Sequence, residues 1–198
     1  MPFRHGTLLF LVLGGLLWAG SAGASPGEEK RFAFGLSLGY GDGITVRSVQ
    51  EGTNVGDVEW MAIEPYLRMR LTELGDGTRW YQGTLNALLM GTIVLNFEPQ
   101  NGHAGGAVAA LRYTIRRGHR LRPYFEAGLG VGRLDFKLQD QADGISFLIH
   151  TTLGLRWAVD DRFALLAGFN WQHISNAKIN IPNPGIDTLG FRIGIEIQ

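Results

Sequence analysis

The chain has 198 residues, enough for one domain, and balances 18 basic against 18 acidic side chains, with 29 glycines and no cysteine. The neutral balance gives no reason to expect nucleic acid as a partner, and the missing cysteine argues against disulfides, thiolate metal sites and a cysteine nucleophile. After the first 24 residues, no uninterrupted apolar segment is long enough for a helical membrane span.

The first 24 residues have the pattern of an export signal. Arg4 and His5 form a short basic start, an apolar run follows from Leu8 to Ala19, and Ala22-Gly23-Ala24 supplies a small-x-small cleavage pattern. The apolar run is shorter than the roughly 20 residues that a spanning helix needs, which disfavours a membrane anchor. We therefore expect a signal peptide over 1–24 and one mature domain over 25–198.

The mature chain alternates between large apolar and small or polar residues with a period of two, as strands do. Eight segments follow this pattern and have the length of transmembrane β-strands. In chain order they lie near Phe32–Tyr40, Val58–Thr72, Trp80–Phe97, Ala107–Arg116, Leu121–Phe136 and Ser146–Val159, with a seventh from Phe163 and an eighth from Asp187. The alternating glycines Gly128, Gly130 and Gly132 fall within a strand, and we expect them to make room for large neighbours.

The two faces of these strands differ in a way that favours a membrane barrel. In the second segment Met61, Ile63, Leu67, Met69 and Leu71 share one face, and Trp60, Glu64, Tyr66, Arg68 and Arg70 share the other. Glu126, His150, Arg156, Arg192 and Glu196 fall on the corresponding polar faces elsewhere. A barrel in lipid turns its apolar face outward and pairs its charges inside. Together with the export signal, this predicts an all-β fold, an eight-stranded antiparallel transmembrane β-barrel in the outer membrane.

The lengths of the connections predict the orientation of the barrel. Short turns are expected at 73–79, 117–120 and 160–162, and mostly longer loops at 42–57, 137–145 and 176–186, with 98–102 as an exception. Outer-membrane barrels have short periplasmic turns and long external loops. The seventh strand should therefore end, and the eighth begin, at the outer leaflet.

Three chemically suggestive residues meet at that end. His173 and Ser175 continue the odd, lipid-facing series of the seventh strand, and Asp187 begins the odd series of the eighth. Facing residues of adjacent antiparallel strands have Cβ atoms roughly 4.5–5.5 Å apart. A serine, an imidazole and a carboxylate brought together in this way form the catalytic set of a serine hydrolase. The loop from Asn176 to Gly185 is the natural source of donors for an oxyanion.

The block His173-x-Ser175-Asn176, followed by Pro182-Asn183-x-Gly185-Ile186 and an acidic residue, resembles the signature of outer-membrane lipid A 3-O-deacylases (acyloxyacyl hydrolase-like). The resemblance is specific over about the last 30 residues and architectural elsewhere. It implies an eight-stranded barrel whose lipid-facing Ser-His-Glu triad removes the ester-linked acyl chain at position 3 of lipid A.

Carried over by motif, the resemblance makes Ser175 the nucleophile and His173 the base. Asn183 helps to form the oxyanion hole, with Asn176 as a second contributor. Three positions depart from the pattern. Asp187 stands where the best-known pattern has glutamate, Lys178 stands where a small residue is expected, and the chain ends in Gln198 instead of an aromatic residue.

The function expected from the sequence is therefore deacylation of lipid A, within lipopolysaccharide of the outer leaflet, without metal or organic cofactor. A non-enzymatic structural barrel is the main alternative. A porin is disfavoured because side chains fill an eight-stranded interior. An acyltransferase is a chemical neighbour, since an acyl-enzyme could pass its chain to another hydroxyl.

Overall fold

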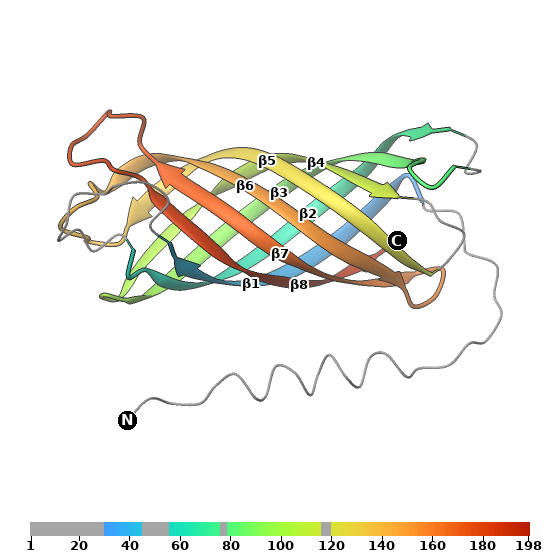
Figure 1. The fold of residues 1–198 in the computed structure, drawn as a ribbon, viewed down its shortest axis with the longest axis horizontal. Helices are drawn as coiled ribbons and strands as arrows, with labels where there is room; N and C mark the ends of the chain where they lie inside the picture. The colour runs from blue at the N-terminus through green and yellow to red at the C-terminus, as the bar shows by residue number, and fades with distance from the viewer. Residues whose placement is uncertain (1–29, 45–55, 76–78, 116–119) are drawn as a thin grey trace, which may run out of the picture.

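The computed structural model describes residues 30–44, 56–75, 79–115 and 120–198, so the expected signal peptide lies outside the described residues. Eight strands follow in chain order: β1 (Phe32–Gly43), β2 (Glu59–Leu74), β3 (Gly83–Glu98), β4 (Gly102–Ile115), β5 (Leu121–Asp135), β6 (Gly144–Ala158), β7 (Phe163–Ser175) and β8 (Ile186–Ile197). Each is antiparallel to the next, and β1 pairs with β8 to close a barrel (Figure 1). The predicted eight-stranded antiparallel barrel is confirmed. Among the described residues, none belongs to a helix that could cross a membrane.

The largest difference from the predicted bounds is in β4, which begins at Gly102 instead of Ala107. Glycine has low strand propensity, and Gly105 and Gly106 hide the alternation in this segment. The structure uses Gly106 for close approach, because a Cβ there would lie 2.5 Å from the Val131 carbonyl oxygen and 2.8 Å from Gly132 Cα. The missing side chain that weakened the sequence pattern is what lets β4 and β5 pair at this point.

The side chains are distributed as in a membrane barrel. Phe169, Phe191, Ile193 and Ile195 point outward, with Phe169 65% exposed, whereas Arg192 and Glu196 are buried inside. Exposed large apolar residues occur on every strand, although β4 has just one, Leu111. An apolar outer wall around a polar interior is the arrangement that a barrel takes in lipid, so the inversion predicted from strand parity is confirmed.

Buried ion pairs fill the interior. Glu126 lies 2.7 Å from Arg112 and 2.8 Å from Arg192, and it lies 3.0 Å from His150. Glu196 contacts Arg68, Arg112 and Arg156 at 3.0–3.3 Å. Gly128 makes room for this network, since a Cβ there would lie 2.7 Å from the His150 ring.

Two residues add detail to the predicted network. Arg70 pairs with Glu73 near the end of β2, where side chains are exposed and the register with β3 shifts between Arg70 and Thr72. Arg112, which the sequence pattern did not single out, lies at the centre between Tyr66 and Tyr124, with its guanidinium 5.1 Å and 5.0 Å from the two rings. The alternation marks the inward face but not the end of the barrel at which a residue lies.

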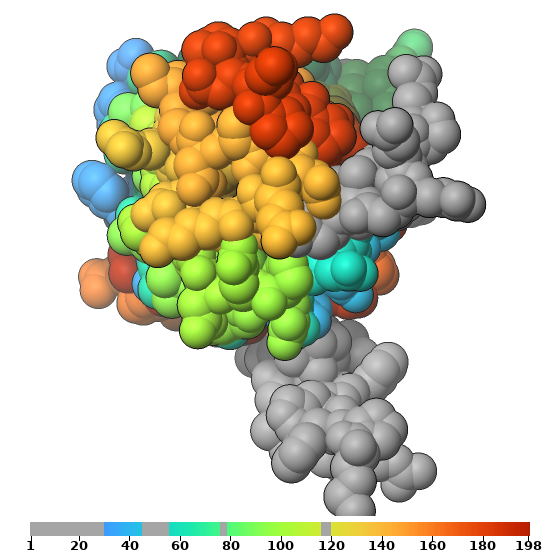
Figure 2. Space-filling model, turned by 90° about the vertical axis from the view of Figure 1, so that its left-hand side faces the viewer, coloured from blue at the N-terminus to red at the C-terminus, as the bar shows by residue number. Residues whose placement is uncertain are grey.

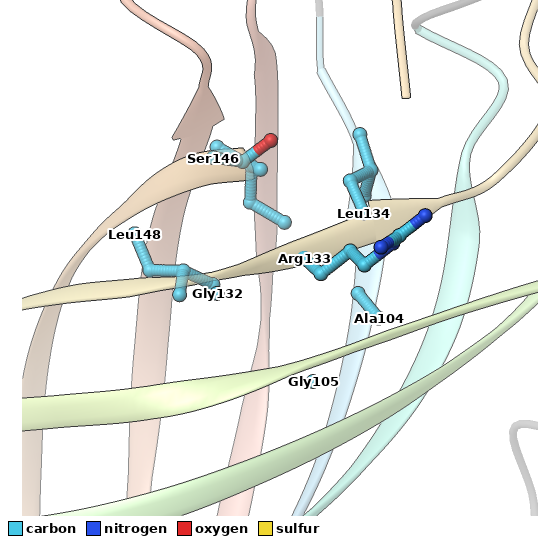
Figure 3. A pocket seen from close by; sticks show the side chains of 8 residues that line it. Ala104, Gly105, Gly132, Arg133, Leu134, Ser146 and Leu148 are labelled. Atoms are coloured by element: carbon cyan, nitrogen blue, oxygen red, sulfur yellow. The ribbon is translucent and has the colours of Figure 1, made fainter. Parts of the chain in front are cut away.

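Little empty space lies near the β4–β6 wall. A hollow of about 10 Å³ lies there, lined by Ala104, Gly105, Gly132, Arg133, Leu134, Ser146, Leu148 and Ile174; Figure 3 shows its lining side chains. That volume holds at most about one water molecule.

The connections separate into two ends of the barrel. The pairs β1–β2, β3–β4, β5–β6 and β7–β8 are joined at one end, and β2–β3, β4–β5 and β6–β7 at the other (Figure 1). Figure 2 looks onto the first end and shows the β5–β6 and β7–β8 connections packed side by side. By the rule that external loops are the longer ones, this end faces outside.

Candidate active site

His173 and Asp187 form a hydrogen-bonded pair on the outer wall. The register between β7 and β8 places them directly opposite each other, and His173 Nδ1 lies 3.0 Å from Asp187 Oδ1. Both side chains are partly buried, with 25% and 19% of their surfaces exposed, so the pair is shielded yet reachable. The aspartate reaches the imidazole although it is one methylene shorter than the glutamate of the family pattern.

The pairing fixes the orientation of the imidazole. A carboxylate only accepts, so Nδ1 carries the proton of this hydrogen bond and Nε2 is left with a free lone pair. The Trp171 ring lies nearly parallel to the imidazole, with centroids 6.2 Å apart and planes 20° from each other. Gly185 packs closely against the ring, because a Cβ there would lie 2.7 Å from His173 Cε1 and 3.3 Å from His173 Nε2. The ring is therefore held by three neighbours, with Nε2 available as a base.

Ser175 shares the wall with this pair but is not bonded to it. It lies two residues beyond His173 on the same face of β7 and opposite Phe147 of β6. Within the described part of the chain, its hydroxyl has no hydrogen-bond partner. Two residues of strand span roughly 6.6 Å, so a short serine side chain does not automatically meet the imidazole. Catalytic hydrogen bonds of this kind are often long without substrate and tighten when substrate binds.

The two asparagines of the motif have different surroundings. The Asn176 side chain is fully buried and its Nδ2 donates to the Asn180 carbonyl oxygen at 3.0 Å. The Asn176 backbone N–H donates to Asn183 Oδ1, also at 3.0 Å. The Asn183 side chain is only partly buried. Asn176 thus supports the loop from within, while the Asn183 side chain is partly exposed on the same loop.

A third amide, not singled out by the sequence pattern, completes this loop. Gln141 of the β5–β6 connection is 1% exposed. Its Nε2 donates to Asn183 Oδ1 at 3.0 Å, and its Oε1 accepts from the Gly185 N–H at 3.1 Å. The Ala142 N–H also donates to the Pro182 carbonyl at 2.7 Å, so the two connections are joined at three points. No local motif around Gln141 signals these contacts.

One departure from the family pattern, Lys178, lies in this loop. Ala177 and Lys178 have positive φ angles of 51° and 65°. This left-handed conformation is unfavourable for most side chains, which gives a physical reason for a small residue at 178. The Lys178 side chain is exposed. His103 lies on the outer face of β4, 3.8 Å from Asp135, while His119 is outside the described residues.

Comparison with known proteins identifies the family and the fold of the chain. A family model described as lipid A 3-O-deacylase (PagL) matches residues 61–196. The crystal structure of the outer membrane enzyme PagL is similar in fold, with 19% identity, a TM-score of 0.59, and coverage of 81% of this chain and 97% of that one. The crystal structure of Neisserial surface protein A has 14% identity, a TM-score of 0.62, and coverage of 85% and 97%. No curated protein sequence matches the chain significantly.

The two solved structures share the barrel fold, and the family model shows the family, because it matches more than half of the chain. The apolar outer wall and the closed barrel agree with an outer-membrane location. On this evidence the chain is an outer-membrane β-barrel that belongs to the lipid A 3-O-deacylase (PagL) family.

Proposed function

We propose that this chain hydrolyses the ester-linked acyl chain at position 3 of lipid A as a serine esterase, with Ser175 as nucleophile, His173 as base and Asp187 as the acid that orients it. The observation that carries the proposal is the 3.0 Å hydrogen bond between His173 Nδ1 and Asp187 Oδ1 on the lipid-facing wall. A purely structural barrel gains little from an oriented imidazole with a free Nε2 beside an unbonded serine hydroxyl.

The first half-reaction forms an acyl-enzyme. Ser175 Oγ attacks the ester carbonyl carbon while His173 Nε2 takes its proton. The oxyanion that forms is stabilised by the Asn183 amide, and the Asp187 carboxylate stabilises the imidazolium. The bond between the carbonyl carbon and the sugar oxygen then breaks, and His173 returns the proton to that oxygen.

The second half-reaction restores the enzyme. A water molecule gives a proton to His173 Nε2 and attacks the acyl-enzyme carbonyl. The bond to Ser175 Oγ breaks, the fatty acid leaves, and Oγ regains its proton from the imidazolium. Asn176 contributes by holding Asn183, since its own N–H groups donate inside the loop.

The substrate class follows from the position of the site on the wall. Phe147 and Phe169 are exposed on the strands that carry or flank Ser175 and His173, and Leu189 and Phe191 are exposed on β8. An ester that reaches this site has to come from an amphiphile in the outer leaflet, with its acyl chains against the apolar wall.

Ser175→Ala and His173→Ala test the mechanism. Each should reduce deacylation by on the order of 10³-fold or more, because nucleophile and base act as one unit. The barrel should remain folded, since neither side chain fills the interior. Mass spectrometry of lipid A from cells that produce each variant measures the loss of the acyl chain. Thr151→Ala, which removes a hydroxyl from the same wall opposite Trp171, is the matched control. Normal deacylation by Ser175→Ala would exclude a serine mechanism.

A further inference from the structure

In the β5–β6 connection, Gln141 is the residue whose side chain bonds two residues of the candidate-site loop. It is 42 positions from Asn183 in the sequence, yet its side chain bonds both Asn183 and Gly185 and is almost completely buried. Buried amides are costly unless they are fully hydrogen bonded. Gln141 satisfies this requirement only while the two connections stay together in the observed arrangement.

Two backbone N–H groups determine how the side-chain amides of Gln141 and Asn183 are oriented. A backbone N–H can only donate, so the Gln141 atom facing Gly185 N must be its oxygen, and the Asn183 atom facing Asn176 N must also be its oxygen. The remaining Gln141 atom is then the nitrogen, which donates to the same Asn183 oxygen. The orientations therefore follow from the hydrogen-bond network itself.

The consequence is that the Asn183 amide has one orientation. Its Oδ1 accepts two hydrogen bonds, from Asn176 N and Gln141 Nε2. Its Nδ2 has no acceptor among the described residues and is left as a donor. Turning the amide over would place Nδ2 against two donors. In the same network, the Gly185 N–H bond anchors the residue that closes against the His173 ring.

We infer that Gln141 is a positioning residue for the reaction: it keeps the Asn183 amide turned so that Nδ2 can donate to the oxyanion, and it holds Gly185 against the imidazole. This inference rests on the proposed esterase function and assigns a role to a loop outside the motif. Gln141 acts through Asn183 and Gly185 and makes no contact of its own with the reacting atoms.

Gln141→Leu and Gln141→Glu test it, with Gln139→Leu as the matched control, because Gln139 is exposed in the same connection. Leucine removes the bonds to Asn183 and Gly185 and also the 3.3 Å bond from Nε2 to the Ala142 carbonyl oxygen. Ionised glutamate keeps an acceptor for Gly185 N but has no donor for Asn183. We expect kcat on purified lipid A to fall about 10- to 100-fold in both variants, with KM changed less than about threefold, because an oxyanion donor acts in the transition state. Gln139→Leu should match the parent.

A double-variant measurement separates positioning from a general loss of structure. If Gln141 acts through the Asn183 amide, Gln141→Glu should lower kcat no further, within about twofold, when Asn183→Ala is already present. The inference would be overturned if the losses in kcat multiplied in the double variant. It would also be overturned if Gln141→Glu alone raised only KM or kept the parental kcat. Folding of each variant is checked by the heat-dependent gel shift of folded barrels. If Gln141→Leu does not fold, Gln141→Glu alone tests the inference. Failure of the parent chain to deacylate lipid A would instead refute the proposed function.

Discussion

Asp187 shows how strand register can compensate for a shorter side chain. Because it lies directly opposite His173, the two backbones are already as close as neighbouring strands allow, with facing Cβ atoms about 4.5–5.5 Å apart. The carboxylate then reaches Nδ1 at 3.0 Å without an additional methylene. A glutamate at this position would have to fold back slightly to make the same contact, which its additional torsion allows.

Asp187→Asn should keep the fold and lower the deacylation rate by about 10²- to 10⁴-fold, because an amide orients the imidazole poorly and does not stabilise the imidazolium. Asp187→Glu should retain substantial activity. Rates on purified lipid A at fixed pH measure both effects. Asp42→Asn, an exposed acid on β1 at the same end of the barrel, is the control and should behave as the parent. If Asp187→Asn deacylates at the parental rate, the third member of the triad lies elsewhere.

Strand parity alone brings His173, Ser175 and Asp187 to one wall, because a period of two assigns every strand residue to a face. It does not reach Gln141, whose partners are decided by how two loops pack and not by any local pattern. It also does not specify whether Ser175 Oγ meets the imidazole, since that depends on side-chain torsions and on bound substrate.

The connection between β7 and β8 depends on Gly185. Its φ of +85° lies in the left-handed region, and a Cβ would lie 2.7 Å from His173 Cε1. Glycines also explain why some strand ends were predicted less well than the middles. β1 continues to Gly43 and β4 begins at Gly102, and glycine has no side chain to show an apolar–polar alternation.

Gly185→Ala should therefore impair catalysis more than stability. Backbone strain in the left-handed region costs about 1–2 kcal/mol, a modest loss for a closed barrel, while the methyl group displaces the imidazole. We expect deacylation to fall at least about tenfold, with the folded barrel still formed on gels. Gly91→Ala is the control, because a Cβ there meets only Pro65 Cγ at 3.7 Å. Parental activity in Gly185→Ala would mean that the imidazole has room to move without cost.

At the scale of the whole molecule, the barrel could be predicted from the count, length and alternation of its strands together with the export signal. The same parity predicted which charged residues point inward, but it did not predict which residue lies at the centre of their network. Arg112 falls on the inward face of β4, in a strand whose first half is mostly glycine and alanine. Which carboxylate meets which guanidinium depends on barrel closure, which brings β8 beside β1 and its Glu196 within reach of Arg68.

This network predicts that stability and catalysis can be separated. Glu196 contacts three guanidinium groups in the buried interior. Glu196→Gln removes their shared counter-charge, and breaking a buried ion pair costs about 3–5 kcal/mol. The exposed pair of Glu73 with Arg70 is the matched control, since Glu73→Gln should cost about 0–1 kcal/mol. Urea unfolding in lipid vesicles measures both.

Asp187 lies nine residues away from Glu196 along β8, roughly 30 Å at the rise of a strand. The folded fraction of Glu196→Gln should therefore deacylate at the parental rate. Equal stability of the two variants would show that the interior charges are not coupled, and the barrel would owe its stability to strand pairing and its apolar wall.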